Sequence, residues 1–202
     1  MNLSFEELKP YIKDLKKIGE GWRGKVYKGI LNEEVLAFKV PISTLHKPAI
    51  KKEGLILKLV NQKGIGGKLV LEGEDFIAYK YIEGKHFKDV INKQNAKSLI
   101  KQVLLQAREL DKLGISKDEM HKPHKNILVD KNLKVYLIDF ERAKKSSNLQ
   151  NVTQFIQYIL SEGANYLSLT DNQKKALIDL AKSYKKNKTD ENFEKILDLL
   201  SL

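Results

Sequence analysis

A glycine-rich segment near the N-terminus has a spacing that suits phosphate binding. Residues 19 to 26 read G-x-G-x-x-G-x-V, and the defined positions are Gly19, Gly21, Gly24 and Val26. Backbone amides can approach phosphate oxygens closely where side chains are missing. A dinucleotide-binding loop would continue into a helix, whereas residues 24 to 30 have the composition of a strand. The alternative is a glycine-softened β-turn, so the motif needs support from other residues.

The next predicted strand, residues 35 to 40, carries a single lysine among apolar neighbours. The ammonium group of Lys39 could neutralise the α- and β-phosphates of a nucleotide, although a solvated lysine at a sheet edge is the alternative. Glu53 lies near the middle of a predicted helix, residues 48 to 61, and could hold Lys39 by an ion pair. Taken alone, Glu53 is better explained as a surface carboxylate, so its role depends on the lysine.

Two segments in the second half of the chain carry the most specific pattern. Residues 121 to 130 read HKPHKNILVD, and residues 136 to 141 read YLIDFE. An Asn-Ile-Leu-Val run, a short hairpin and an apolar run ending in Asp-Phe resemble the catalytic loop and metal-binding segment of the protein kinase superfamily. With the glycine motif, Lys39 and Glu53, the resemblance covers roughly residues 12 to 143, in the order that the family shows.

The resemblance implies a site for ATP and Mg²⁺ at the junction of a β-rich lobe and a helical lobe. Lys39, fixed by Glu53, would orient the phosphates. Asn126 and Asp139 would bind Mg²⁺, for which amide and carboxylate oxygens are suitable hard ligands. The adenine would lie near Tyr81 and Ile82. The remaining expected nucleotide contacts are the glycine-loop residues Gly19, Gly21, Gly24 and Val26, together with Ala37 and Ile138.

The chain also departs from the family pattern. His121 stands five residues before Asn126, where the family places its catalytic aspartate, and Pro123 replaces a customary lysine. Glu141 replaces the glycine that follows Asp-Phe. No Ala-Pro-Glu segment follows, and only about 60 residues remain, which is similar to the small atypical archaeal kinases and to RIO-type kinases.

His121 is open to three interpretations. Its neutral imidazole could accept the proton of a substrate hydroxyl, because phosphoryl transfer depends mostly on positioning and charge stabilisation. Asp118 or Glu119 could serve as the base instead, from a different offset. The third interpretation is that His121 only lines a loop, which leaves a nucleotide-binding pseudokinase or a slow ATPase.

A metal site shared by His121 and His124 is less well supported. Pro123 interrupts helical geometry between the two histidines, and no third ligand is evident nearby in the sequence. Lys122 and Lys125 would repel a divalent ion, and they suit the γ-phosphate or an acidic substrate better.

Composition indicates a globular, cytoplasmic protein with no membrane partner. The chain has 202 residues, 42% of them hydrophobic and 31% charged, and no cysteine, which excludes disulfides and cysteine nucleophiles. We find neither a signal peptide nor an apolar run long enough to span a membrane. The net charge is +11, but only three basic residues are arginine, so a nucleic-acid partner is possible but not favoured. The sequence does not indicate an oligomeric state.

We therefore predict an α+β protein with a protein-kinase-like two-lobed fold, forming one domain over residues 1 to 202. The N-lobe, residues 12 to 82, would hold a five-stranded antiparallel sheet and one helix. The C-lobe, residues 83 to 202, would be mainly helical. Its helices are expected at residues 96 to 113, 149 to 162, 171 to 184 and 190 to 201, and a hairpin at residues 127 to 138.

The predicted activity is transfer of the ATP γ-phosphoryl group to a serine or threonine hydroxyl of a protein, including the chain itself. The enzyme would be an atypical, archaeal-type serine/threonine kinase with His121, Lys39 and Asp139 as catalytic residues. The alternative is a pseudokinase or slow ATPase that acts as a nucleotide-gated adaptor for a protein or RNA partner. A metabolite kinase is a third possibility, since small-molecule phosphotransferases share the fold.

Overall fold

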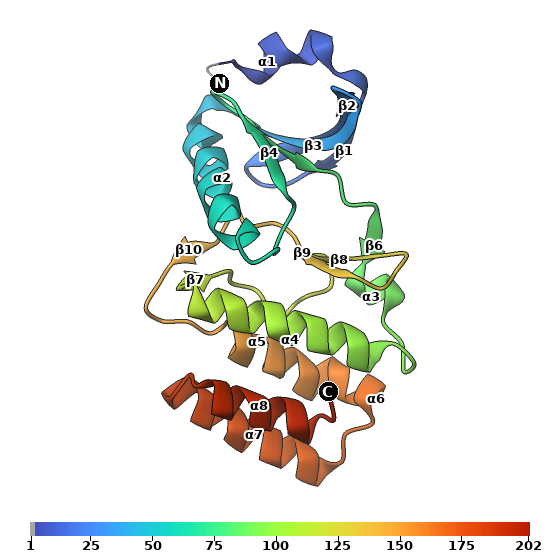
Figure 1. Ribbon diagram of the computed structural model, residues 1–202, viewed down its shortest axis with the longest axis vertical. Helices are drawn as coiled ribbons and strands as arrows, with labels where there is room; N and C mark the ends of the chain where they lie inside the picture. Colours follow the sequence, from blue (N-terminus) through green and yellow to red (C-terminus); the bar gives the residue numbers. More distant parts are fainter. Residues whose placement is uncertain (1–2) are drawn as a thin grey trace. The chain divides into compact units, whose positions relative to one another are not determined.

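The computed structural model describes residues 3 to 202, so residues 1 and 2 of the predicted domain lie outside the described residues. The described chain divides into two compact units (Figure 1). The first unit holds the chain up to Glu83 together with Asp139–Ala143, and the second holds Gly84–Ile138 and Lys144–Leu202. Each unit contains both helices and strands, which confirms the predicted α+β class.

The first unit contains the predicted five-stranded sheet, and all of its strand pairs are antiparallel. The strand order is β1-β2-β3-β5-β4. Asn32 and Glu33 join β2 to β3 and both have positive φ, 49° and 66°, as a tight two-residue hairpin turn requires. The strands are β1 (Lys13–Glu20), β2 (Gly24–Leu31), β3 (Glu34–Pro41), β4 (Leu69–Glu72) and β5 (Ile77–Lys80).

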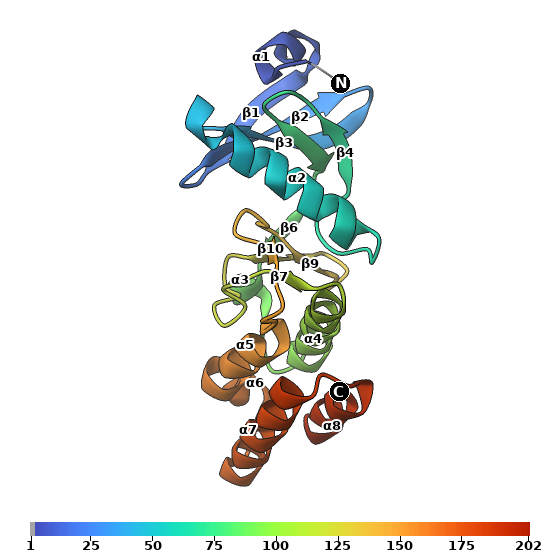
Figure 2. The same cartoon turned by 90° about the vertical axis from the view of Figure 1, so that its left-hand side faces the viewer.

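Helices cover both faces of this sheet. Helix α1 (Phe5–Leu8) starts with a capping box formed by Ser4 and Glu7, and a 3₁₀ turn, Lys9–Tyr11, continues it. After a second 3₁₀ turn, Thr44–His46, helix α2 (Lys47–Asn61) crosses the sheet (Figures 1 and 2). The helix predicted over residues 48 to 61 is thus confirmed.

Successive side chains of β3 point to opposite faces of the sheet, which decides whether each one meets α1 or α2. Leu36, Phe38 and Val40 belong to a core cluster that also includes Phe5 and Leu8 around α1. Because successive strand residues point to opposite faces, Lys39 points away from that core, toward α2. The same alternation that buries the phenylalanine therefore directs the lysine at the helix that carries Glu53.

The second unit is mainly helical. Helix α4 lies beside α5, and α7 and α8 form a neighbouring pair, as both ribbon views show (Figures 1 and 2). Two small sheets accompany them, with the strand orders β6-β8-β9 and β10-β7. The helices are α3 (Phe87–Val90), α4 (Ala96–Lys112), α5 (Asn151–Tyr158), α6 (Ala164–Leu167), α7 (Asp171–Lys186) and α8 (Asp190–Leu199). The strands are β6 (Gly84–His86), β7 (Ile115–Ser116), β8 (Ile127–Asp130), β9 (Val135–Leu137) and β10 (Lys144–Lys145).

A buried polar network joins three helices of this unit. The Asp111 carboxylate on α4 accepts hydrogen bonds from the Asn151 Nδ2 group at 2.7 Å and from the Tyr184 hydroxyl at 2.7 Å. The Asn151 Nδ2 group also donates to the Ile115 carbonyl, and its Oδ1 atom accepts from the Lys117 amide. The network therefore also anchors the start of the loop that leads to His121.

Most predicted elements of this unit are confirmed within a few residues, but some details differ. The helix expected over residues 149 to 162 begins at Asn151 and widens into a π-helical turn, Ile159–Gly163, before α6. The β6–β8 and β7–β10 pairings were not predicted, because strands of two or three residues are too short to show periodicity. Across residues 3 to 202, none of the helices has the length and apolar character needed to cross a membrane.

Candidate functional site

The glycine motif forms the turn of the β1–β2 hairpin. The Gly21 amide donates to the Gly24 carbonyl at 2.8 Å, and Gly19 pairs with Val26 across the strands. Strand β2 begins at Gly24 itself, which confirms the predicted strand and excludes the helix that a dinucleotide-binding loop needs. A Cβ atom on Gly24 would lie 3.1 Å from the Val40 carbonyl oxygen. A side chain at this third glycine would therefore force its neighbours to move.

Lys39 sits in the middle strand of the sheet, between Val26 of β2 and Ile77 of β5. Only 6% of its surface is exposed, and Glu53 on α2 is 3% exposed. The Lys39 Nζ atom lies 2.6 Å from Glu53 Oε2. The predicted ion pair is therefore confirmed, whereas a solvated edge lysine and an ordinary surface glutamate are both wrong for these positions.

The segment Asp139–Ala143 brings two more carboxylates to the same lysine. Lys39 Nζ lies 3.3 Å from Glu141 Oε2 and 3.6 Å from Asp139 Oδ1. The amide of Phe140, which is buried, donates to Glu53 Oε1 at 3.3 Å. These contacts hold the segment against β3 and α2. Lys39 and Asp139, which are 100 positions apart in the sequence, thus share one site.

Asp139 has an unusual backbone conformation. Its φ angle is 61°, in the left-handed region that aspartate tolerates better than most residues. Non-glycine residues held in this region cluster at ligand and active sites. The Asp139 side chain is 53% exposed, so its carboxylate is accessible to solvent while the neighbouring Phe140 is buried.

One lysine shared by three carboxylates perturbs the titration of the cluster. Burial alone would lower the pKa of Lys39, but the Glu53 and Asp139 carboxylates outweigh it and raise that pKa above its usual value. Burial raises the pKa of Glu53 above its usual range, although Lys39 opposes this change. Burial and the Glu53 charge likewise raise the pKa of Tyr79. The lysine therefore stays charged near neutral pH, with three carboxyl groups around it.

The expected adenine-side residues lie on β3 and just beyond β5. Ala37 is buried on the same face of β3 as Lys39. The Tyr81 amide donates to the Val35 carbonyl at 3.1 Å, and Lys28 Nζ lies 4.2 Å from the centre of the Tyr81 ring. Tyr81 and the adjacent Ile82 are partly exposed.

Asn126 and the two histidines lie in the second unit, in the loop between β7 and β8. The Asn126 carbonyl accepts a hydrogen bond at 2.9 Å from the amide of Ile138, the residue before Asp139. His121 is partly exposed in a turn of this loop. Asp118 and Glu119, the alternative bases, have φ angles of 68° and 56°, so this stretch of the loop is tightly bent.

His124 has a partner that sequence reasoning missed. Its Nε2 atom lies 2.7 Å from Glu162 Oε2, and its ring packs edge-on against Tyr158. Glu162 belongs to the π-helical turn, whose extra residue per turn changes the direction of its side chains. Within residues 3 to 202, no group of three or more His, Asp or Glu side chains is placed to hold a metal, so a shared His121/His124 metal site gains no support.

The cluster also contains two residues that the sequence did not assign to it. Glu141 was noted only as a replacement for glycine, yet it contacts Lys39 and lies 3.7 Å from Arg23 of the glycine loop. The signal available in the sequence was an acid two positions after Asp139. No pattern in the sequence around Arg23 could identify its role, because its contact with Glu141 depends on how the glycine loop packs against the segment Asp139–Ala143.

Comparisons with known proteins add one similarity. No protein-family model matches this chain. A protein of Methanocaldococcus jannaschii named "Uncharacterized protein MJ1211" is 28% identical over 116 residues, which cover 53% of this chain and 98% of that protein. The chain is thus similar to an archaeal protein over about half of its own length.

Proposed function

We propose that this chain binds ATP with Mg²⁺ and transfers the γ-phosphoryl group to a serine or threonine hydroxyl of a protein, including its own. It would have a protein-kinase-like fold, with residues 12 to 82 as N-lobe and residues 83 to 202 as C-lobe. The observation that carries the proposal is the position of Lys39. This buried lysine is held by Glu53 at 2.6 Å, with Asp139 at 3.6 Å.

A lysine fixed in this way suits phosphate binding. Its ammonium group has already lost most of its water and is held by an ion pair, so it need not reorganise when phosphate oxygens approach. The adjacent glycine loop, Gly19 to Val26, offers backbone amides on the strand next to β3. Ala37, Tyr81, Ile82 and Ile138 would contact the nucleotide beyond the phosphates.

Asp139 and Asn126 fit a Mg²⁺ ion by their chemistry. The Asp139 carboxylate is half exposed, and both side chains offer hard oxygens. A Mg²⁺ ion usually keeps several waters and takes its remaining ligands from phosphates, so two protein ligands are sufficient. The ion would supply positive charge to the phosphate oxygens. His121 would accept the proton of the acceptor hydroxyl, a role that leaves most of the catalysis to positioning.

Labelled phosphate transfer tests the proposal. Wild-type protein and the Asp139→Ala variant would each be incubated with Mg²⁺ and γ-labelled ATP, alone and with a generic protein acceptor. Asp179→Ala is the matched control, because Asp179 is an exposed carboxylate on α7 of the second unit, where it pairs with Lys182. We expect label in the wild type and the control and a loss of at least about tenfold in Asp139→Ala. Equal label in all three proteins would remove the proposal.

A nucleotide-gated adaptor is the second candidate. Two observations favour it: His121 stands where the family places its catalytic aspartate, and Glu141 contacts the lysine that phosphates would need. Such a pseudokinase or slow ATPase would show a thermal shift with Mg·ATP but no labelled acceptor.

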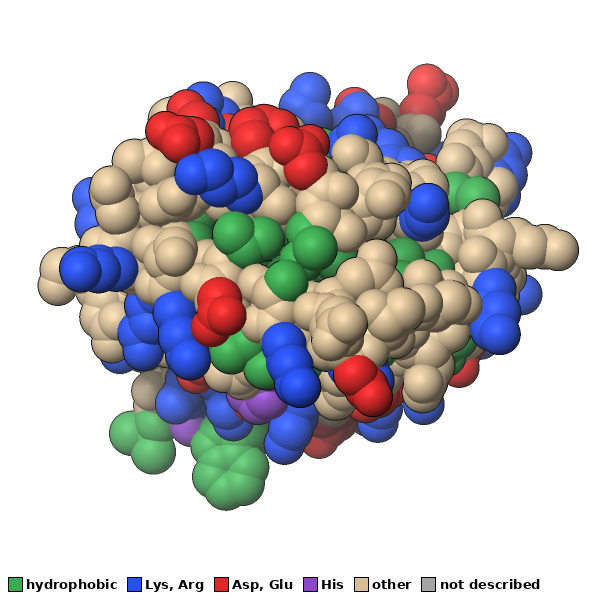
Figure 3. Space-filling model, turned by 90° about the horizontal axis from the view of Figure 1, so that it is seen from below, with side chains coloured by type: hydrophobic (Ala, Val, Ile, Leu, Met, Phe, Trp, Pro, Cys, Tyr) green, Lys and Arg blue, Asp and Glu red, His purple; other side chains and the backbone are tan. Residues whose placement is uncertain are grey.

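The partner of such an adaptor is better explained as a protein than as RNA. On the face drawn in Figure 3, lysine and arginine side chains are interspersed with acidic ones, which suits a protein partner better than RNA. The cysteine-free chain fits the cytoplasm.

A further inference from the structure

Glu141 links both cations of the cluster. Its carboxylate lies 3.3 Å from Lys39 Nζ and 3.7 Å from an Arg23 guanidinium nitrogen, and its side chain is only 13% exposed. Glu53 and Asp139 already supply two carboxylates to the same lysine. The Glu141 charge is therefore not needed to neutralise Lys39.

We propose that Glu141 occupies the place of phosphate oxygens, and that a polyphosphate displaces it and takes over Lys39 and Arg23 as its two cations. This inference deepens the proposed function and rests on it. It names Arg23 as a phosphate-binding residue and Glu141 as its internal competitor. Binding would break the Glu141 contacts with both cations. Negatively charged phosphate oxygens would then contact Lys39 and Arg23 in place of the carboxylate.

Charge balance identifies Glu141 as the group that must leave. Three carboxylates share two cations, Lys39 and Arg23, and an incoming polyphosphate adds further negative charge, which favours the departure of a like charge. Glu53 cannot leave easily, because it is buried on α2 and also accepts a hydrogen bond from the Phe140 amide. Glu141 is held through its side chain to Lys39 and Arg23, the two cations that a phosphate would recruit.

Arg23 is suited to this exchange by its place in the glycine loop. Its carbonyl accepts a hydrogen bond from the Ile42 amide at 2.9 Å, which fixes the backbone to the end of β3. Its side chain is 40% exposed and can change partner while the loop stays in place. A guanidinium group matches the geometry of phosphate oxygens as well as that of carboxylates. The transfer of Arg23 from Glu141 to phosphate therefore requires only a side-chain movement.

The chain contains its own reporter for this exchange. Trp22 is the single tryptophan, it precedes Arg23, and 84% of its surface is exposed. Its fluorescence follows the glycine loop without any label. Inorganic tripolyphosphate without Mg²⁺ is the probe, since it offers phosphate oxygens but no base, sugar or metal. Calorimetry would give the dissociation constant, and Trp22 fluorescence would report the change of partner at the neighbouring Arg23.

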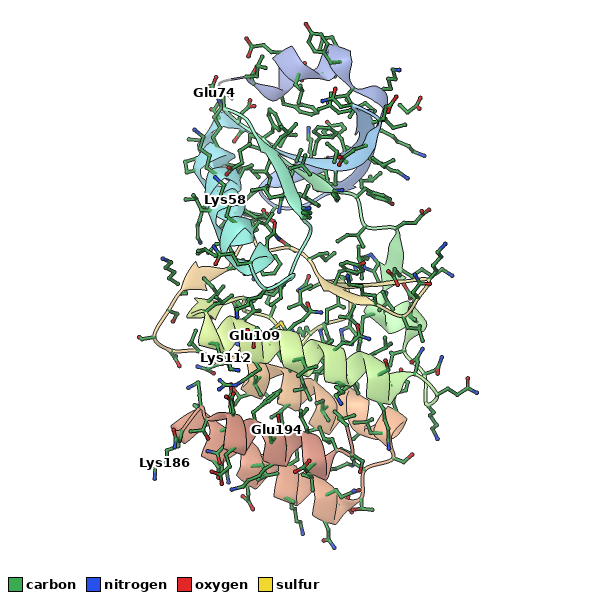
Figure 4. All side chains as sticks on the ribbon, viewed as in Figure 1. Lys58, Glu74, Glu109, Lys112, Lys186 and Glu194 are labelled. Atoms are coloured by element: carbon green, nitrogen blue, oxygen red, sulfur yellow. The ribbon has the colours of Figure 1, made fainter. Side chains whose placement is uncertain are left out.

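Three variants test the exchange. Glu141→Gln removes the competitor, and we expect it to bind tripolyphosphate about tenfold more tightly than wild type. Arg23→Gln removes the second cation, and we expect binding about tenfold weaker. Glu74→Gln is the control, because Glu74, labelled in Figure 4, lies in the turn between β4 and β5 and pairs with Lys47 on the surface of the same unit. The control should bind as wild type does.

The outcomes separate this inference from the proposed function. If Glu141→Gln binds tripolyphosphate no more tightly than wild type, or if Arg23→Gln binds equally well, the exchange is refuted even when Mg·ATP binds. If both variants shift as expected but Mg·ATP gives no binding in any protein, the exchange stands and the nucleotide assignment fails. Loss of Mg·ATP binding in Glu141→Gln would also overturn the inference, because it would make Glu141 a ligand of the bound metal. Thermal unfolding verifies that each variant is folded.

Discussion

Replacement of Lys39 by methionine should destabilise the protein in a way that depends on pH. Methionine fills similar space but removes the only cation within 4 Å of Glu53 among the ion pairs of the described residues. Glu53 is 3% exposed, so its unpaired carboxylate must either stay charged in a dry environment or take up a proton. Breaking a buried ion pair by removing one partner typically costs about 3–5 kcal/mol.

Protonation of Glu53 sets the size of the effect. With an ordinary pKa of 4.5, this carboxyl takes up a proton at pH 7 at a cost of about 3 kcal/mol, at about 1.36 kcal/mol per pH unit. The same protonation at pH 5 costs only about 1 kcal/mol. Lys39→Met should therefore lose about 3 kcal/mol of unfolding free energy at pH 7 and about 1 kcal/mol at pH 5.

The sign follows from the direction of the pKa shift. Burial raises the pKa of Glu53 in the folded protein, and Lys39 is the group that opposes the rise. Without Lys39 the folded pKa rises further above the unfolded value. A carboxyl of this kind binds more protons in the folded state, so stability is lost as pH increases from 4.5 upward and is regained on acidification.

Urea unfolding of wild type and variant at pH 5, 6 and 7 measures the difference. Lys47→Met is the matched control, because Lys47 pairs with Glu74 at 3.1 Å on the surface. We expect the control to stay within about 1 kcal/mol of wild type at every pH. A Lys39→Met penalty that is equal at pH 5 and pH 7, or no larger than that of the control, would refute the reasoning.

Substitutions at three further positions test local contacts by denaturant unfolding. Tyr184→Phe removes the 2.7 Å hydrogen bond to Asp111 Oδ2 and the 3.2 Å bond accepted from Arg108, both buried, and should cost about 1–3 kcal/mol; no loss would mean that the network is dispensable. Gly24→Ala places a Cβ atom 3.2 Å from Lys39 Cε, so it should cost about 1–2 kcal/mol and weaken Mg·ATP binding. Unchanged stability would show that the loop can move to accommodate the added atom. Thr170→Ala removes the side-chain cap of α7 and should cost about 1 kcal/mol, whereas Thr170→Ser should not.

Local sequence determined most of the secondary structure. The Ser4 and Thr170 capping boxes mark helix starts because cap and backbone amide are only three residues apart. The apolar spacing of residues 96 to 113 predicted α4, and Gly114, with a φ angle of 70°, ends it as glycine commonly does. In each case the deciding interactions lie within one or two turns of the chain.

Periodicity was less informative where function is expected. Residues 35 to 40 were predicted as a strand because they are apolar apart from Lys39, but this composition could not show which face would meet α2 and so whether Lys39 would be buried. The widening of the helix at Ile159–Gly163, which directs Glu162 toward His124, has no local signature either. Both features depend on packing against elements that lie far away along the chain.

The sequence by itself therefore determined the order of the elements, the glycine turn, and the presence of a lysine and an aspartate able to serve a phosphate site. Tertiary structure alone decided that the segment Asp139–Ala143 joins the sheet unit and adds two carboxylates, beside that of Glu53, around Lys39. The physical reason is the separation along the chain over which each kind of interaction acts. Propensities and caps act between neighbours, whereas an ion pair between positions 100 residues apart forms only after the burial of side chains such as Phe140 has brought their strands and helices together.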